Sequence, residues 1–149
     1  LDVQFIIDNS DLGKFYKTKI KKMQKFNSSK LKDDETKINI METEIKNLKN
    51  IISETEKKNK VNNLNLLLKD YQIKRVKLDK EIIDSKKNFT TKILEILNPI
   101  LTNFVEKENI VLVVEKKNIL VGIKSLDITQ EILEILNQET INNNLINEN

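Results

Sequence analysis

The feature that most constrains this chain is a long run of apolar residues spaced alternately three and four residues apart. The first half of the run comprises Leu31, Ile38, Met41, Ile45, Leu48 and Ile52. The second half comprises Leu64, Leu68, Tyr71, Leu78, Ile82, Phe89, Ile93, Ile96 and Ile100. This spacing is the 3.5-residue repeat of a coiled-coil seam, which neither a strand nor a loop can use. The sequence therefore predicts two long helices packed along one seam.

A polar stretch at 56–63 interrupts the repeat between these two halves. We expect a helical hairpin over 12–99 that folds back at a tip at about 57–63. Each arm would have roughly 40 to 45 residues, so the hairpin would be on the order of 60–65 Å long. Helices of that length are far longer than those of an ordinary globular domain.

The predicted seam is weakest between residues 27 and 37, where Leu31 is its only apolar member. Extending the repeat places Asn27 and Asp34 at core positions, and Arg75 and Ser85 interrupt the second arm. Polar residues at core positions lower the stability of a coiled coil. We therefore predict a bend, frayed packing or a hinge in this part of the first arm.

Short runs of β-branched residues flank the predicted hairpin. Residues 1–7 read as a strand, and the runs 110–115 and 119–123 read as a β-hairpin joined by a short polar connector. Asp127 or Thr129 would cap a short helix, Pro99 would kink or restart the second arm, and the Asn-rich tail 138–149 would be disordered. The candidate strand residues are Val3, Phe5, Ile7, Val111, Val113, Ile119, Val121 and Ile123.

Three short strands would leave open edges and an uncovered apolar face, which is unstable in isolation. We therefore predict that segments 1–11 and 100–137 form one discontinuous body that self-associates. The expected fold class is α+β, mainly α. It consists of a long antiparallel coiled-coil hairpin projecting from a small β base that oligomerisation completes.

The composition argues against an enzyme. The chain has no His, Cys or Trp and only 2 Gly, so it offers no phosphate-binding loop and no base for a Ser nucleophile. The acidic run 33–35 is expected on a solvated helix face. We expect no cofactor, no metal site and no calcium loop.

Charge is distributed unevenly along the chain. Residues 14–95 carry 22 Lys or Arg against 12 Asp or Glu, a net charge of +10, and the two ends together carry −7. A basic, elongated surface favours partners with negative charge, although AT-rich coding would enrich Lys in the same way. Nucleic acid is not expected as a partner, because Arg75 is the only Arg and we expect the basic surface to lack interleaved aromatic residues.

Several apolar residues lie off the predicted seam, and lysines are interleaved with them on the second arm. They could flank the coiled coil or a neighbouring arm, or they could face a shared cavity that holds an unfolded chain weakly. Lys57, Lys58 and Lys60 at the predicted tip would form an ordinary solvated turn or a contact for anionic lipid or an acidic client. The candidate client-binding residues are Ile40, Ile51, Leu66, Leu67, Ile73, Val76, Ile83, Lys69, Lys80 and Lys87.

The two ends of the chain resemble a known family. The N-terminal stretch reads LDVQFIIDNSDLGK, and the C-terminal segments are 109–114, 119–121 and 126–133, in which Asp127-Ile128-Thr129 followed by Glu131 is the most specific piece. Over residues 1–137 the chain resembles the OmpH-like (Skp) family of periplasmic chaperones.

The resemblance implies a homotrimer whose strands form a small barrel. Three helical hairpins would then enclose unfolded outer-membrane proteins without using ATP. It also implies a periplasmic location, a signal peptide that has been removed, a first strand that begins before Leu1, and an anionic lipid or lipopolysaccharide contact at the tip. Two alternatives stay open. One is a structural coiled-coil adaptor for a folded partner, and the other is a cytosolic prefoldin-like chaperone, in which the strands lie between the helices.

Overall fold

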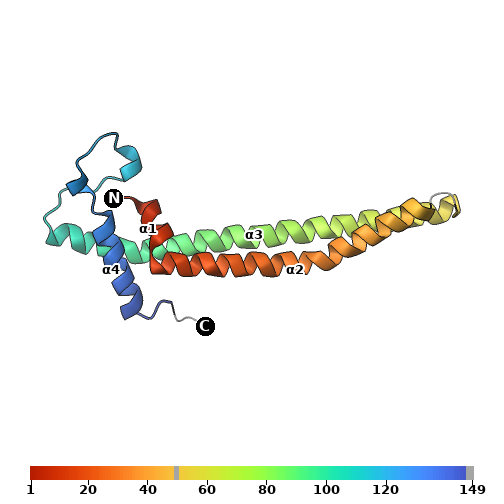
Figure 1. Cartoon of the computed structure of the whole chain (residues 1–149), viewed down its shortest axis with the longest axis horizontal. Helices are drawn as coiled ribbons and strands as arrows, with labels where there is room; N and C mark the ends of the chain where they lie inside the picture. The colour runs from red at the N-terminus through yellow and green to blue at the C-terminus, as the bar shows by residue number, and fades with distance from the viewer. Residues whose placement is uncertain (49–50, 147–149) are drawn as a thin grey trace. The chain divides into compact units, whose positions relative to one another are not determined.

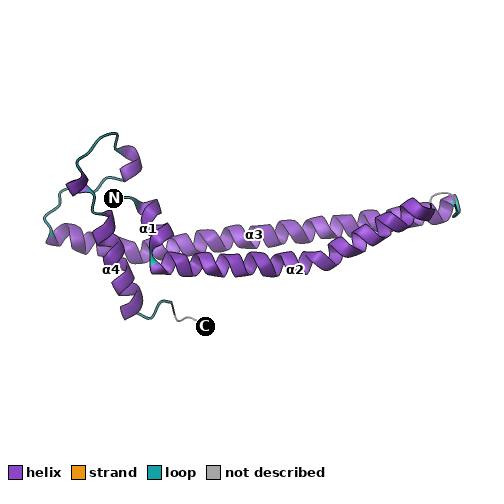
Figure 2. Cartoon of the chain, in the orientation of Figure 1, coloured by secondary structure: helices purple, strands orange, loops and turns teal. Residues whose placement is uncertain are grey.

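The computed structural model describes residues 1–48 and 51–146, and the chain divides into two compact units (Figure 1). Unit 1 comprises Leu1–Ile20 and Ser85–Asn149, and unit 2 comprises Lys21–Asp84. The elements in chain order are helices α1 (Val3–Asn9), α2 (Asp11–Leu48) and α3 (Glu54–Lys107), the 3₁₀ turns η1 (Lys116–Asn118) and η2 (Lys124–Leu126), and helix α4 (Thr129–Asn142). The residues that the structure describes contain no strand (Figure 2). The mainly helical prediction is confirmed, and the β base is not seen in the single chain.

The predicted helical hairpin is confirmed within unit 2. Ile38 of α2 and, further along the seam, Leu78 and Ile82 of α3 are buried. Cross-helix contacts join Glu44 to Lys60, Asp34 to Lys74 and Asn27 to the Leu78 carbonyl. In these contacts the residue number in α2 falls as the residue number in α3 rises, so the two helices run antiparallel.

The turn of the hairpin lies earlier than the predicted position at 57–63. Residues 57–63 belong to α3, and the break falls between Leu48 and Glu54. A capping box fixes this start: the Ser53 backbone N–H donates to the Glu56 carboxylate at 3.0 Å, and the Glu56 N–H donates to Ser53 Oγ at 3.3 Å. Reciprocal bonds of this kind satisfy two N–H groups that a helix start leaves without partners.

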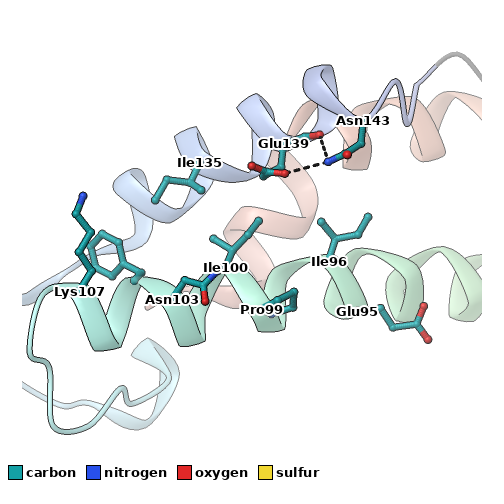
Figure 3. Close-up of a pocket in the computed structure, with 10 residues that line it drawn as sticks. Glu95, Ile96, Pro99, Ile100, Asn103, Lys107, Ile135, Glu139 and Asn143 are labelled. Carbon is teal, nitrogen blue, oxygen red and sulfur yellow. Dashed lines mark hydrogen bonds between the residues drawn. The ribbon is translucent and has the colours of Figure 1, made fainter.

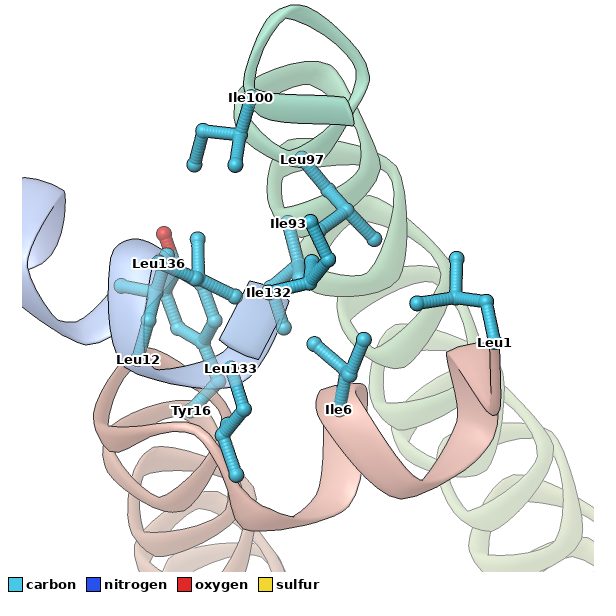
Figure 4. Packing of buried hydrophobic residues seen from close by; sticks show 10 residues of the cluster. All are labelled: Leu1, Ile6, Leu12, Tyr16, Ile93, Leu97, Ile100, Ile132, Leu133 and Leu136. Atoms are coloured by element: carbon cyan, nitrogen blue, oxygen red, sulfur yellow. The ribbon is translucent and has the colours of Figure 1, made fainter. Parts of the chain in front are cut away.

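Unit 1 has its own hydrophobic core, to which all four helices contribute (Figure 4). Tyr16 of α2 also stacks on Phe89 of α3, with ring centroids 4.2 Å apart. The buried members of this core are Leu1, Ile6, Leu12, Tyr16, Ile93, Leu97, Ile100, Ile132, Leu133 and Leu136.

The strand predicted at residues 1–7 is wrong, because these residues form helix α1. The Asp2 side chain caps the helix by accepting from the Phe5 N–H at 2.9 Å. Ile6 is fully buried, whereas Phe5 is exposed. The buried positions follow helical spacing, with Val3 and Ile7 half-buried beside Ile6, so the apparent alternation of Val3, Phe5 and Ile7 did not mark one face of a strand.

Helices α1 and α2 approach each other closely at Gly13. A Cβ atom on Gly13 would lie 1.8 Å from the Ile7 carbonyl oxygen. The Gly13 N–H donates to the buried Ser10 Oγ at 3.1 Å, so Ser10 caps α2 at this point. The sharp joint between the two helices therefore requires glycine at position 13.

The predicted β-hairpin at 110–123 is also not formed in the single chain. Helix α3 ends in a Schellman motif, in which Asn109 has φ 54° and the Ile110 N–H donates to the Val105 carbonyl at 2.9 Å. The predicted connector forms η1, and no described residue pairs the two runs. The N-terminal amine of Leu1 donates to the Val114 carbonyl at 3.2 Å, and the Lys116 N–H donates to the Leu1 carbonyl at 2.8 Å. These two bonds make a single rung of a parallel ladder.

Helix α4 closes unit 1 against α1 and α2. Thr129 Oγ1 accepts from the Asp2 N–H at 2.8 Å and donates to Asp127 Oδ1, and Asp127 Oδ2 accepts from Lys116 Nζ at 2.7 Å. Asn137 Oδ1 accepts from the Asp11 N–H at 2.9 Å. The segment Asp127-Ile128-Thr129 therefore links the start of the chain to the start of α4 by hydrogen bonds.

Two further predictions about α3 and the tail need correction. Helix α3 continues through Pro99 without a break. The tail predicted to be disordered from 138 is helical to Asn142, and Leu145 and Ile146 pack on the core of unit 1. Residues 147–149 of the predicted tail lie outside the described residues.

We predict that Gly13→Ala lowers the free energy of unfolding by about 2–4 kcal/mol, because the backbone of α1 must move away from the new Cβ. Gly122→Ala is the matched control, since a Cβ there would meet only Ile119 Cγ2 at 3.6 Å. Denaturant titration of both variants measures the difference. Equal stability of the two variants would contradict the close approach at Gly13.

We predict that the stabilising effect of Asp127 is lost at low pH. The Lys116 ammonium, followed by the Thr129 hydroxyl, holds the pKa of the Asp127 carboxyl well below its usual range. A lowered folded-state pKa contributes stability above the unfolded value of about 3.9, and this contribution disappears as pH falls toward the folded value. The stability difference between wild type and Asp127→Asn should therefore be constant near neutral pH and shrink below about pH 4. Asp33→Asn, at an exposed position of unit 2, is the control. A difference that did not change with pH would contradict the assignment.

Candidate functional site

The outward face of α3 in unit 2 carries an apolar stripe formed by Leu66, Ile73, Val76 and Ile83. These side chains are 58 to 68% exposed. At 100° per residue they lie on the side of the helix opposite the buried Leu78 and Ile82. They therefore do not flank the seam with α2, and the interpretations that remain are contact with a neighbouring arm and a surface that faces a shared cavity.

Three lysines predicted to accompany the stripe are also exposed: Lys69 and Lys80 in unit 2, and Lys87 in unit 1. Within the described parts of the chain, none of the three makes an ion pair, whereas Lys57, Lys60 and Lys74 each pair with a carboxylate. The outward face of α3 in unit 2 thus combines apolar side chains with lysines that carry uncompensated charge.

Two other predicted residues, Ile40 of α2 and Leu67 of α3, come together in one groove. The groove has a volume of about 530 Å³ and is also lined by Met41. Charged residues from both helices, among them Lys37 and Asp70, stand at its edge. Ile40 is exposed and Leu67 is half-buried. The groove is shallow and lies on the flank of the helical pair.

The predicted basic tip is largely neutralised. Lys57 Nζ lies 3.5 Å from Glu54 Oε1, and Lys60 Nζ lies 3.3 Å from Glu44 Oε2. Lys58 is exposed in the first turns of α3, and Ile51 in the preceding turn is also exposed. Ion pairs at this end of unit 2 weaken the case for an anionic contact there.

A polar layer crosses the seam between α2 and α3, as the sequence predicted for Asn27 and Asp34, which are half-buried. Lys74, rather than Arg75, faces Asp34, with Lys74 Nζ 2.6 Å from Asp34 Oδ2, whereas Asn27 Nδ2 donates to the Leu78 carbonyl. The Lys74 ammonium lowers the pKa of the Asp34 carboxyl. Helix α2 remains unbroken through this stretch and bends gently within unit 2 (Figure 1).

A second cross-helix bond adjoins this polar layer. Tyr71 Oη donates to Glu35 Oε1 at 2.6 Å, and the Glu35 carboxylate raises the pKa of the Tyr71 hydroxyl. Polar contacts therefore replace apolar packing across this part of the hairpin.

Most residues predicted to form the oligomerisation body are exposed on unit 1. Val111 and Val121 are almost fully exposed, Ile119 and Ile123 are exposed, and Val113 is half-buried against the core. Leu112, Val114, Leu120 and Leu126 add further exposed apolar side chains to the same segment. An apolar patch of this extent on one short segment is a feature of an interaction surface.

Sequence reasoning missed a groove between α3 and α4 in unit 1 (Figure 3). It has a volume of about 560 Å³, and Ile96, Ile100, Phe104 and Ile135 form its apolar lining. Pro99 lines the groove and cannot donate a hydrogen bond to the Glu95 carbonyl. The sequence signal at this place is Pro99, which predicts a kink or a restart of the helix.

The part of the chain that the structure describes has no helix apolar and long enough to span a membrane. Across residues 1–48 and 51–146, no group of acidic side chains is arranged to hold a metal ion.

The chain combines an antiparallel coiled-coil hairpin, whose outward face is apolar and basic, with a small helical core. These features place it in the class of helical-hairpin proteins. The chain belongs to the family of OmpH-like outer membrane proteins, whose profile matches residues 1–136. This match confirms the resemblance found at the two ends of the sequence.

Among solved structures, the chain is similar to a protein from Caulobacter crescentus CB15 assigned as an outer membrane chaperone (OmpH-like). The TM-score is 0.77 at 14% sequence identity, and the match covers 90% of this chain and 79% of the other. At this identity the similarity shows the fold alone. No curated protein matches the chain.

We predict that amide hydrogens of residues 27–37 exchange faster than those of 12–23, because the polar layer leaves little apolar surface to hold the seam closed. Replacing Asp34 and Lys74 together by Leu should slow this exchange, since a polar pair exchanged for packed apolar residues is often stabilising. Asp34→Leu alone should slow it less, because Lys74 then faces the seam without its partner. Uniform slow exchange along α2 in the wild type would contradict the prediction.

Proposed function

We propose that this protein is an ATP-independent holdase chaperone for unfolded outer-membrane proteins. The observation that carries the proposal is the exposed stripe of Leu66, Ile73, Val76 and Ile83 with its accompanying lysines, in a chain of the OmpH-like family. Apolar side chains set singly among charges favour weak, multivalent contact with many sequences over tight recognition of one.

The client surface is proposed to extend over both arms. It includes the flank groove at Ile40 and Leu67, and Ile51 at the hairpin turn. The net charge of +10 on residues 14–95 would attract unfolded chains that carry acidic segments. The ion-paired lysines at the turn contribute little to this attraction, so a lipid or lipopolysaccharide contact is not part of the proposal.

We further propose that unit 1 gathers copies into a homotrimer in the periplasm. Supporting this are the exposed apolar residues of segment 111–126 and the single ladder rung between Leu1 and the backbone flanking Glu115. Pairing of this segment with other copies would remove apolar surface from water and complete backbone hydrogen bonds. A non-enzymatic role is consistent with the absence of His and Cys from the sequence.

A prefoldin-like arrangement has less support. It requires strands between the two long helices, but only five residues separate Leu48 from Glu54. Five residues are too few for a β-hairpin with two strands of ordinary length.

The proposal predicts that the chain suppresses aggregation of an unfolded porin diluted from denaturant, measured by light scattering. Replacing Leu66, Ile73, Val76 and Ile83 together by Ser should leave helicity and oligomeric state unchanged and weaken this protection severalfold. Ile141→Ser, at an exposed apolar position on α4, is the surface control and should protect like the wild type.

Two results would contradict the holdase proposal. The wild-type chain could fail to protect the porin at any ratio, or the fourfold Ser variant could protect as well as the wild type. If the lysines contribute, protection of the porin against aggregation should weaken as ionic strength rises. Protection that is unchanged up to about molar salt would assign the contact to the apolar residues alone.

A further inference from the structure

The outward face of α3 in unit 2 has a regularity that weak holding does not require. Leu66, Lys69, Ile73, Val76, Lys80 and Ile83 follow one another at steps of three, four, three, four and three residues. This is a complete coiled-coil repeat in which Leu66, Ile73 and Lys80 take the a positions and the other three take the d positions. A seam of this kind normally packs against another helix.

All six side chains of this second seam are exposed. Among the described residues, Lys69 and Lys80 make no ion pair, although Lys74 and Arg75 on the same helix do. The second seam therefore presents four apolar positions and two uncompensated positive charges at known places in the repeat.

The arrangement of the lysines argues against a second copy of the same face as the partner. In a parallel pair with full overlap, Lys69 would face Lys69 and Lys80 would face Lys80. In an antiparallel pair with full overlap, Leu66 would face Ile83, Ile73 would face Val76, and Lys69 would face Lys80. Both arrangements bring like charges together in the seam, which disfavours pairing.

We propose that this face of α3 docks an amphipathic helix of a different protein that carries Glu or Asp opposite Lys69 and Lys80 and apolar residues at its other core positions. Carboxylates at those places satisfy both lysines, and the apolar positions bury Leu66, Ile73, Val76 and Ile83. The proposal goes beyond the holding of unfolded β-barrel proteins. It requires a helical ligand in a fixed register.

Three helical peptides of about three heptads test the proposal. The first has Leu opposite the four apolar positions and Glu opposite Lys69 and Lys80, and the other two have Lys or Leu in place of both Glu residues. The order of positions along the seam reads the same in both directions, so one peptide fits a parallel or an antiparallel arrangement. Binding to the full chain is measured by fluorescence anisotropy of labelled peptide near 0.15 M salt.

The Glu peptide is expected to bind at least about tenfold more tightly than the Lys peptide, with the Leu peptide between them. The double variant Lys69→Glu/Lys80→Glu should reverse this order. The matched control is Lys25→Glu/Lys32→Glu, which makes the same change in net charge at exposed positions of α2 and should leave the order unchanged.

Equal binding of the three peptides, or loss of binding in the α2 control as large as in the α3 variant, would overturn the proposal. Displacement of the Glu peptide by phosphatidylglycerol vesicles, with vesicle binding lost in both double variants alike, would also overturn it in favour of a membrane surface. Protection of an unfolded porin is measured separately, so failure of the peptide test leaves the holdase proposal standing.

Discussion

Two helices packed on each other can bury only one face each, and much of this protein follows from that constraint. In unit 2 the buried face is a single seam at Ile38, Leu78 and Ile82, interrupted by the polar layer around Asp34 and Lys74. On the opposite face of α3, Leu66, Ile73, Val76 and Ile83 remain in contact with water. These apolar side chains recur at regular spacing, and exposing them to water lowers solubility. Contact with other chains would explain why they are on the surface.

Unit 1 buries its apolar residues differently, because four helices pack around one core. The joint at Gly13 lets α1 turn back against α2, and the Asp2, Thr129 and Asp127 contacts hold the start of the chain on α4. This core leaves segment 111–126 outside with most of its apolar residues exposed. The unit therefore combines a stable helical core with a surface that a partner chain can cover.

The sequence predicted the long helices and the polar positions at Asn27 and Asp34 because both depend on local spacing. Its errors have physical causes. The runs at 110–115 and 119–123 have strand composition, but a two-stranded hairpin is only marginally stable without further strands or a face to pack on, and the single chain forms none there. The buried Ile6 in α1 shows that a short stretch with period-2 alternation can also suit a helix once a cap is present. The Ser53–Glu56 capping box marks the observed start of α3, and a capping box is a pattern that the sequence alone displays. The stacking of Tyr16 on Phe89 depends on how α2 and α3 pack, which spacing alone does not determine.

The claim on which this account depends is that unit 1 is completed by other copies of the chain. Analytical ultracentrifugation of the chain, combined with hydrogen exchange of residues 110–126, tests it most directly. The account predicts a trimer in which the amides of this segment are protected. A monomer at all concentrations, with this segment exchanging freely, would contradict it.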